Sequence, residues 1–172
     1  MLIPPSVLCP VDFSDASRGA LRYAAALAEH FYADLTVLTV DDPFLADAAE
    51  AALGAKWLEQ QTRQALEEFV EDGFPTRNPQ LRHRRLVVET GQPAAVILRV
   101  AGETEADAIV MSTHGMSGVR KMMFGSVTER VLRDTRVPVI VTPATNPGPA
   151  SLEEWKNGLE AILVPATRST RA

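Results

Sequence analysis

The sequence predicts a single-domain α/β protein with an open five-stranded parallel sheet and helices on both faces. Two observations predict this class. Short apolar runs alternate along the chain with longer segments of helical periodicity, a pattern typical of parallel strands joined by helical crossovers. The chain has 172 residues, 46% of them hydrophobic, which is enough for one core of ordinary size.

The first half of the chain contains two strand–helix pairs. Residues 7–11 form a short apolar run, and Ser14 is the expected N-cap of a helix over residues 16–31, where apolar side chains recur at helical spacing. Residues 35–40 form the second apolar run. The pattern then predicts one helix over about residues 47–71, which a glycine and a proline shortly afterwards end.

The second half continues the alternation. A third strand is expected at residues 86–88, and Pro93 stands near the first position of the helix that follows, where proline is tolerated. Residues 108–111 form the fourth strand. An amphipathic helix over residues 126–133 precedes the fifth strand at residues 137–141.

Composition excludes several classes of function. The net charge of −5 gives no reason to expect binding to nucleic acid or to an anionic membrane. The basic cluster at residues 82–85 is interpreted as a solvated strand face. Cys9 is the one cysteine, which excludes an intramolecular disulfide and a cysteine metal site and predicts a buried, reduced thiol. No apolar run approaches membrane-spanning length, so the cytoplasm is the simplest location.

The loop after the fourth strand is the strongest functional signal. It begins with residues 112–115 and ends at Gly125 and Ser126, where the next helix begins. A strand, a glycine-bearing loop and a helix N-terminus in this order favour phosphate, because unpaired amides and the helix dipole point at the ligand. Ligands of parallel sheets bind beyond the strand ends, so Asp12, Val40 and Asp41 are further candidates.

These motifs together resemble the universal stress protein family, nucleotide-binding subgroup. Residues 7–14 are similar to its first strand and acidic turn, and residues 108–115 resemble its fourth strand and loop. Residues 125–129 and 137–141 complete the pattern, so that the resemblance covers roughly residues 5–143. It implies a Rossmann-like fold of the adenine nucleotide alpha hydrolase-like class and binding of ATP, with or without Mg²⁺.

The nucleotide motif of that family reads Gly, two residues, Gly, nine residues, then Gly followed by Ser or Thr. The second and third glycines match Gly115 and Gly125, and the hydroxyl residue is Ser126. The first glycine position holds Ser112, the one departure within the motif. A serine there costs on the order of 1 kcal/mol if the backbone needs a positive φ. It fits, or adds a hydrogen bond, if the ligand only needs to come close.

The resemblance also assigns a role to each binding residue. Asp12 would bind the ribose hydroxyls, and Ser126 would place its hydroxyl on the terminal phosphates. The adenine would be bordered by Pro10, Val40 and Met111. The phosphates would be held by backbone N–H groups of Gly115, Gly125, Ser126 and Val127, with Ser112 beside them.

Several of these residues also have structural interpretations. Ser126 and the glutamate three positions later form a capping-box pattern, in which Ser126 only caps its helix. Asp12 is equally suited to an Asx-turn or an N-cap. His114 has no evident nucleophile or metal partner and is interpreted as structural. Arg120 and Lys121 either touch phosphate or form a solvated loop face.

Other phosphate-binding folds do not fit. The chain lacks the Gly-x4-Gly-Lys-Ser/Thr motif and a Gly-x-Gly-x-x-Gly after its first strand. A receiver domain would need an acidic pair after the first strand, where Asp12 is followed by Phe13. No catalytic or metal-ligand constellation is visible. The leading hypothesis is an ATP-dependent regulatory or stress protein; the alternatives are a non-nucleotide interaction module and a weak ATPase.

Domain organisation is expected to be simple. Residues 1–145 form the domain, and residues 146–172 form a tail with a short helix at residues 151–161 and a brief apolar run at residues 162–164. The fifth strand, Val137 to Val141, is expected at a sheet edge that needs covering. The family pairs such strands between subunits, so the resemblance implies a homodimer, with a regulatory partner that the sequence does not name.

Overall fold

The computed structural model describes residues 5–54, 56–73, 84–113, 125–145, 148–149 and 154. The strands are β1 (Ser6–Pro10), β2 (Asp34–Asp41), β3 (Arg84–Thr90), β4 (Ala108–Ser112) and β5 (Val139–Thr142). The helices are α1 (Asp15–Phe31), α2 (Pro43–Leu53), α3 (Trp57–Gly73), α4 (Pro93–Glu103) and α5 (Ser126–Asp134). All strand pairs are parallel, in the order β3-β2-β1-β4-β5. The predicted fold class is confirmed.

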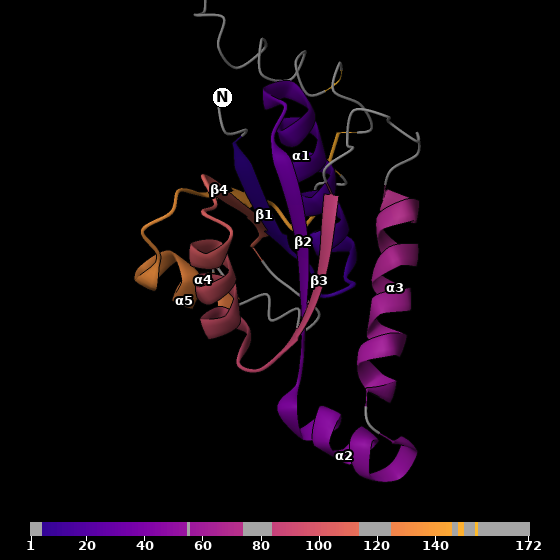
Figure 1. Ribbon diagram of the computed structural model, residues 1–172. Coiled ribbons are helices and arrows are strands. Elements are labelled where there is room, and N and C mark those ends of the chain that lie inside the picture. Colours follow the sequence, from indigo (N-terminus) through magenta and orange to yellow (C-terminus); the bar gives the residue numbers. More distant parts are fainter. Residues whose placement is uncertain are drawn as a thin grey trace, which may run out of the picture.

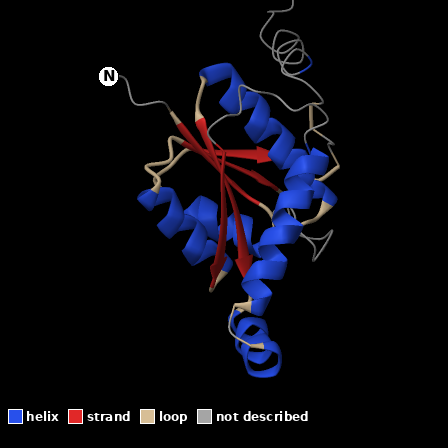
Figure 2. Ribbon diagram, turned by 45° about the vertical axis from the view of Figure 1, so that its right-hand side comes forward, coloured by secondary structure: helices blue, strands red, loops and turns tan. Residues whose placement is uncertain are grey.

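Helices cover both faces of the sheet (Figures 1 and 2). Alternate side chains of each strand enter one of two cores, because successive residues of a strand point to opposite faces. On the face of α1 and α3, Cys9, Val37 and Val110 join one buried cluster. On the face of α4 and α5, Leu8 and Ile109 join the other. Cys9 is a free, fully buried thiol, as predicted, and burial raises its pKa.

Helix α1 lies close to the sheet because its buried face is made largely of alanine. Ala20 and Ala24 are fully buried against the strands. The predicted N-cap is confirmed: the Ser14 hydroxyl accepts a hydrogen bond from the N–H of Ser17 at 3.1 Å. The helix ends at Tyr32, a left-handed residue with φ of 54° whose N–H bonds back into the last turn.

The prediction of one helix over residues 47–71 is wrong. Two helices occupy this region, separated at Gly54, which has a φ of 97°, and Lys56, which has a φ of 66°. No α-helix continues through such backbone. The first helix also begins earlier than predicted, at Pro43, since the Asp42 carboxylate accepts hydrogen bonds from the first-turn amides. Because apolar side chains recur at helical spacing on both sides of Gly54, the sequence pattern did not indicate a break between two helices.

The other boundaries agree more closely. Strand β3 is longer than predicted because seven of its residues pair with β2, and Arg84 and Arg85 lie exposed on it, as expected of a solvated strand face. Strand β5 lies at a sheet edge, as predicted, but spans Val139–Thr142. The tail elements predicted at residues 151–161 and 162–164 lie outside the described residues, apart from Glu154. Within the described ranges, no helix has the length and apolar character needed to cross a bilayer.

Gly148, which follows β5 in the chain, packs on α1. Gly148 has a φ of 76°, and a Cβ there would lie 2.5 Å from the carbonyl oxygen of Gly19. We expect Gly148→Ala to lower the free energy of unfolding by about 1–3 kcal/mol through overpacking. Gly102 in α4 has no neighbour within 4 Å of such a Cβ, so Gly102→Ala is expected to raise it by about 0.5–1 kcal/mol. Urea unfolding of both variants measures the two opposite shifts; an unchanged midpoint for Gly148→Ala would contradict the contact.

Candidate functional site

A single pocket gathers most of the predicted binding residues. It has a volume of about 560 Å³, within the range of small-molecule sites. It lies beyond the carboxyl ends of β1, β2 and β4, where the chain crosses from one half of the sheet to the other. The lining residues are Pro10, Val11, Asp12, Phe13, Ser17, Leu38, Thr39, Val40, Asp41, Asp42, Leu45, Pro93, Ile97, Met111, Ser112, Gly125, Ser126, Val127 and Thr128.

The turn after β1 holds Asp12 at the pocket wall. One oxygen of its carboxylate, Oδ1, accepts hydrogen bonds from both the N–H and the hydroxyl of Ser14, at 3.2 and 2.6 Å. This is the Asx-turn that the sequence offered as an alternative. The turn is tight enough to hold Phe13 at a φ of 63°, a conformation that bulky residues rarely adopt. The turn therefore orients the carboxylate, and its structural role is compatible with ligand binding.

Two acidic residues line the pocket beyond β2. The Thr62 hydroxyl on α3 donates a hydrogen bond to Asp41 Oδ1 at 2.9 Å, and Asp42 caps α2. Burial raises the pKa of the Asp41 carboxyl, the hydrogen bond from Thr62 opposes the rise, and the negative charge of Glu59 adds to it. Asp12, Asp41 and Asp42 thus contribute three carboxylates to the pocket wall, and the described lining residues include no basic side chain.

The raised pKa of Asp41 predicts a pH effect on stability. A carboxyl with a raised folded-state pKa favours folding most at low pH, and this contribution is lost as the pH rises through the raised value. Asp41→Asn keeps an oxygen acceptor for Thr62 and removes the charge. The variant is therefore expected to exceed the parent in stability at neutral pH, by a margin that shrinks towards acid pH. Unfolding curves across the pH range measure this margin; Glu71→Gln, an exposed carboxylate of α3, is the control.

Ser112, the departure from the glycine motif, causes no backbone strain. It is the last residue of β4, paired with Thr142 of β5, and it is absent from the positive-φ positions of the described chain. The cost considered for a serine at positive φ therefore does not arise. Its carbonyl accepts a hydrogen bond from the buried Thr128 hydroxyl at 3.0 Å, and the Gly125 N–H donates to Thr113 O at 2.7 Å. These two bonds fasten the start of α5 to the end of β4.

The capping-box prediction for α5 is wrong. Gly125 is the N-cap and Ser126 the first helical residue, and none of the described side chains caps this end of the helix. The first-turn amides therefore have no side-chain cap from the described residues, whereas the corresponding ends of α1 and α2 are capped by Ser14 and Asp42. An uncapped helix N-terminus at a pocket wall favours an anionic group.

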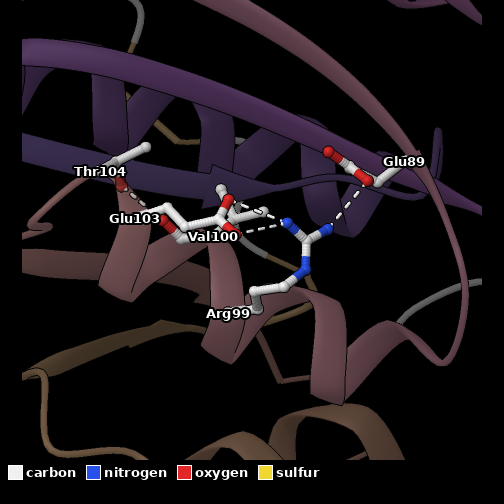
Figure 3. A network of polar contacts seen from close by, with 5 residues as sticks. All are labelled: Glu89, Arg99, Val100, Glu103 and Thr104. Atoms are coloured by element: carbon white, nitrogen blue, oxygen red, sulfur yellow. Dashed lines mark hydrogen bonds and ion pairs between the residues drawn. The ribbon is translucent and has the colours of Figure 1, made fainter.

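Helix α4 supplies another part of the pocket wall through Pro93 and Ile97. A polar network holds this helix against the end of β3 (Figure 3): the Arg99 guanidinium lies 2.8 Å from Glu89 and 2.7 Å from Glu103. These side chains are about half exposed, so the network orients the helix more than it stabilises the fold.

Eight of the nine predicted binding residues lie in this one pocket. They are Pro10, Asp12, Val40, Met111, Ser112, Gly125, Ser126 and Val127. The ninth, Gly115, lies outside the described residues, together with His114, Arg120 and Lys121. Sequence reasoning missed Asp42 and Leu45 as pocket residues. The pair Asp42-Pro43 is a helix-start signal that could have placed both at the rim.

In the described part of the chain, no group of three or more His, Cys, Asp or Glu side chains is placed to hold a metal ion. The three carboxylates of the pocket are therefore not, by themselves, a resident cation site.

The structure is a parallel α/β domain with a pocket at its switch point, the place where folds of this class bind their ligands. Within that class, the chain belongs to the universal stress protein family, whose sequence profile, described as "Universal stress protein family", matches residues 5–143. The recognition made from the motifs is confirmed.

Individual relatives agree with this assignment. Universal stress protein MJ0531 of Methanocaldococcus jannaschii is 32% identical over 143 residues, which cover 78% of this chain and 79% of the relative. A universal stress protein solved in complex with cAMP is similar in fold, with a TM-score of 0.59, 19% identity and coverage of 84% of this chain and all 100% of that one. A universal stress protein from Archaeoglobus fulgidus, solved in complex with dAMP, has a TM-score of 0.53, 23% identity and coverage of 82% and 98%.

Proposed function

We propose that this universal stress protein binds ATP in the pocket at the strand ends and acts as a nucleotide-dependent regulatory protein of the stress response. The observation that carries the proposal is the convergence of five chain segments on one pocket. They bring together apolar strand-end residues such as Val40 and Met111, the carboxylate of Asp12, and the uncapped amides of α5.

Each part of the pocket has a matching part in an adenine nucleotide. Apolar side chains suit the face of a purine. A carboxylate such as that of Asp12 accepts hydrogen bonds from the two ribose hydroxyls. The first-turn amides of Ser126 and Val127 suit phosphate oxygens. Relatives of the same fold were solved with cAMP and with dAMP, which supports an adenine nucleotide as the ligand class.

Calorimetric titration with ATP and native mass spectrometry of the purified protein test the proposal. We expect saturable binding, weakened about tenfold by Asp12→Asn, which keeps an oxygen for the Ser14 turn and loses the charge-assisted bonds to ribose. Asp15→Asn, an exposed carboxylate of α1 that does not line the pocket, is expected to bind like the parent. Absence of both bound nucleotide and saturable titration would overturn the proposal.

Magnesium is expected to strengthen ATP binding. Asp12, Asp41 and Asp42 surround the pocket with negative charge, which repels a free triphosphate and repels its magnesium complex less. The titration should therefore show weaker binding when EDTA replaces Mg²⁺, by several-fold at low salt. AMP carries fewer charges and should be less affected, and equal Mg²⁺ dependence for AMP and ATP would contradict this explanation.

We propose a homodimer through β5, whose Ile140 side chain is 40% exposed at the sheet edge, because an uncovered edge strand readily pairs with another. Sedimentation equilibrium should give twice the chain mass of 18.7 kDa. We place the protein in the cytoplasm, where the Cys9 thiol stays reduced.

A further inference from the structure

Helix α2 is the least covered element of the described structure. None of its residues is buried. The helix follows the carboxyl end of β2 and lies away from the sheet, at one end of the molecule (Figures 1 and 2). Yet its sequence is mostly apolar. Phe44 is 81% exposed and Leu45 is 64% exposed. An exposed apolar helix next to a pocket is typical of an interaction surface.

Four of the exposed apolar residues share one face of this helix. Phe44, Ala48, Ala51 and Ala52 follow one another at helical spacing and are all exposed. We call this set the α2 face. The alanines leave room for another backbone to approach closely, and Phe44 offers a large ring for burial. A helix that lies along the α2 face can therefore make both kinds of contact.

The charges beside the α2 face have a single sign. Asp47 lies one turn from Phe44, Glu50 lies one turn further, and both are exposed. Helix α2 contains no lysine, arginine or histidine. With Asp42 at its N-cap, the helix carries three acidic groups at its surface and none that neutralises them.

We propose that the α2 face is a docking site for a basic amphipathic helix of a partner protein. The apolar side of that helix packs on Phe44 and the alanines, and its lysines or arginines pair with Asp47 and Glu50. This mode joins a helix-in-groove contact with complementary charge. It does not depend on ATP binding.

Charge decides between this occupant and two others. A second copy of α2 would bring two all-acidic helices together, and like charges across an interface disfavour association. An anionic lipid surface would be repelled by Asp47 and Glu50, whereas membrane-surface helices carry lysine and arginine beside their apolar face. A basic amphipathic helix is complementary to both the apolar and the acidic parts of this surface.

A titration with synthetic peptides tests the proposal on the full chain. The probe is a labelled peptide of leucine and lysine, about 14 residues or roughly four turns long, with its leucines at helical spacing. Fluorescence anisotropy should show saturable binding at micromolar concentration. A scrambled peptide of equal composition and a peptide with glutamate in place of lysine should both bind at least about tenfold more weakly, because each lacks one of the two complementary features.

Two variants locate the binding on α2. Phe44→Ser removes the exposed ring and should weaken binding about tenfold, and its control is Tyr32→Ser, which removes an aromatic side chain that is 79% exposed at the end of α1. Glu50→Lys should weaken binding about fivefold. Its control, Glu71→Lys, alters an exposed residue near the far end of α3. Both altered α2 side chains are exposed, and circular dichroism verifies that each variant is folded.

Three results would overturn the proposal. They are absence of saturable binding, equal affinity for the scrambled or the glutamate peptide, and equal losses from the α2 variants and their controls. Sedimentation of the free protein adds a fourth: an association that Phe44→Ser abolishes would show that a second copy occupies the α2 face. Failure of ATP binding leaves these measurements unaffected, so the two proposals are tested separately.

Discussion

Replacing Ser126 with aspartate is expected to lower ATP affinity by at least about tenfold without destabilising the fold. Ser126 is the first residue of α5, it is exposed, and its amide belongs to the uncapped end of the helix. An aspartate there places a negative charge where the proposal puts phosphate. Two unit charges about 4 Å apart repel by about 4 kcal/mol at an effective dielectric constant near 20.

The effect on stability has the opposite sign. An acidic side chain in the first turn interacts favourably with the helix dipole, by about 0.3–1 kcal/mol. Ser126→Asp should therefore unfold at an equal or slightly higher denaturant concentration. Affinity lost together with stability would instead indicate that the substitution damages the fold, and the affinity result would then say nothing about phosphate.

Ser126→Asn is the matched control, since asparagine has the shape of aspartate without its charge. It should retain most of the ATP affinity measured by calorimetry. If Ser126→Asn and Ser126→Asp bind ATP equally well, phosphate does not lie at the start of α5, and this part of the proposed function is wrong.

Leu8→Ala is expected to destabilise the protein by about 2–5 kcal/mol. Leu8 is fully buried in the middle of β1, between β2 and β4, and belongs to the core beneath α4 and α5. Truncation removes apolar contacts and leaves a cavity that strands paired on both sides cannot close. Typical domains are stable by only about 5–15 kcal/mol, so this one change removes a large share.

The matched control is Leu53→Ala at the end of α2, where the leucine is 57% exposed. It should change the free energy of unfolding by less than about 0.5 kcal/mol. Denaturant unfolding monitored by circular dichroism gives both values, provided that the slope of the transition is unchanged. A loss below about 1 kcal/mol for Leu8→Ala would contradict the tight packing of β1.

Prediction from sequence was most successful where the periodicity was long and unbroken. The segment of α1 shows a helical stripe of alanine and leucine after Ser14, and both its N-cap and its extent were predicted nearly to the residue. It failed at α2 and α3, where apolar spacing continued across Gly54. Periodicity shows the positions of the apolar side chains. It does not indicate the backbone angle of a residue between two helices, so the break at Gly54 was not predicted.

The pocket residues that lie at strand ends could be predicted from the sequence, because the strands themselves could be. Asp12, Val40 and Ser112 follow or end their strands, and parallel strands place those ends at one edge of the sheet. Leu45 and Ile97 were not predicted, because a residue inside a helix reaches a pocket only through the angle at which that helix leaves the sheet. That angle depends on contacts between elements far apart in the sequence.

The sequence by itself determined the fold class, the family and the strand ends at which a ligand is expected, because hydrophobic periodicity and short motifs are local properties. Only the tertiary structure decided three further points. It gave Ser112 an extended backbone, it left the N-terminus of α5 without a cap from any described side chain, and it left α2 uncovered. Each of these points depends on contacts between residues of separate elements, and the order of residue types along the chain does not specify those contacts.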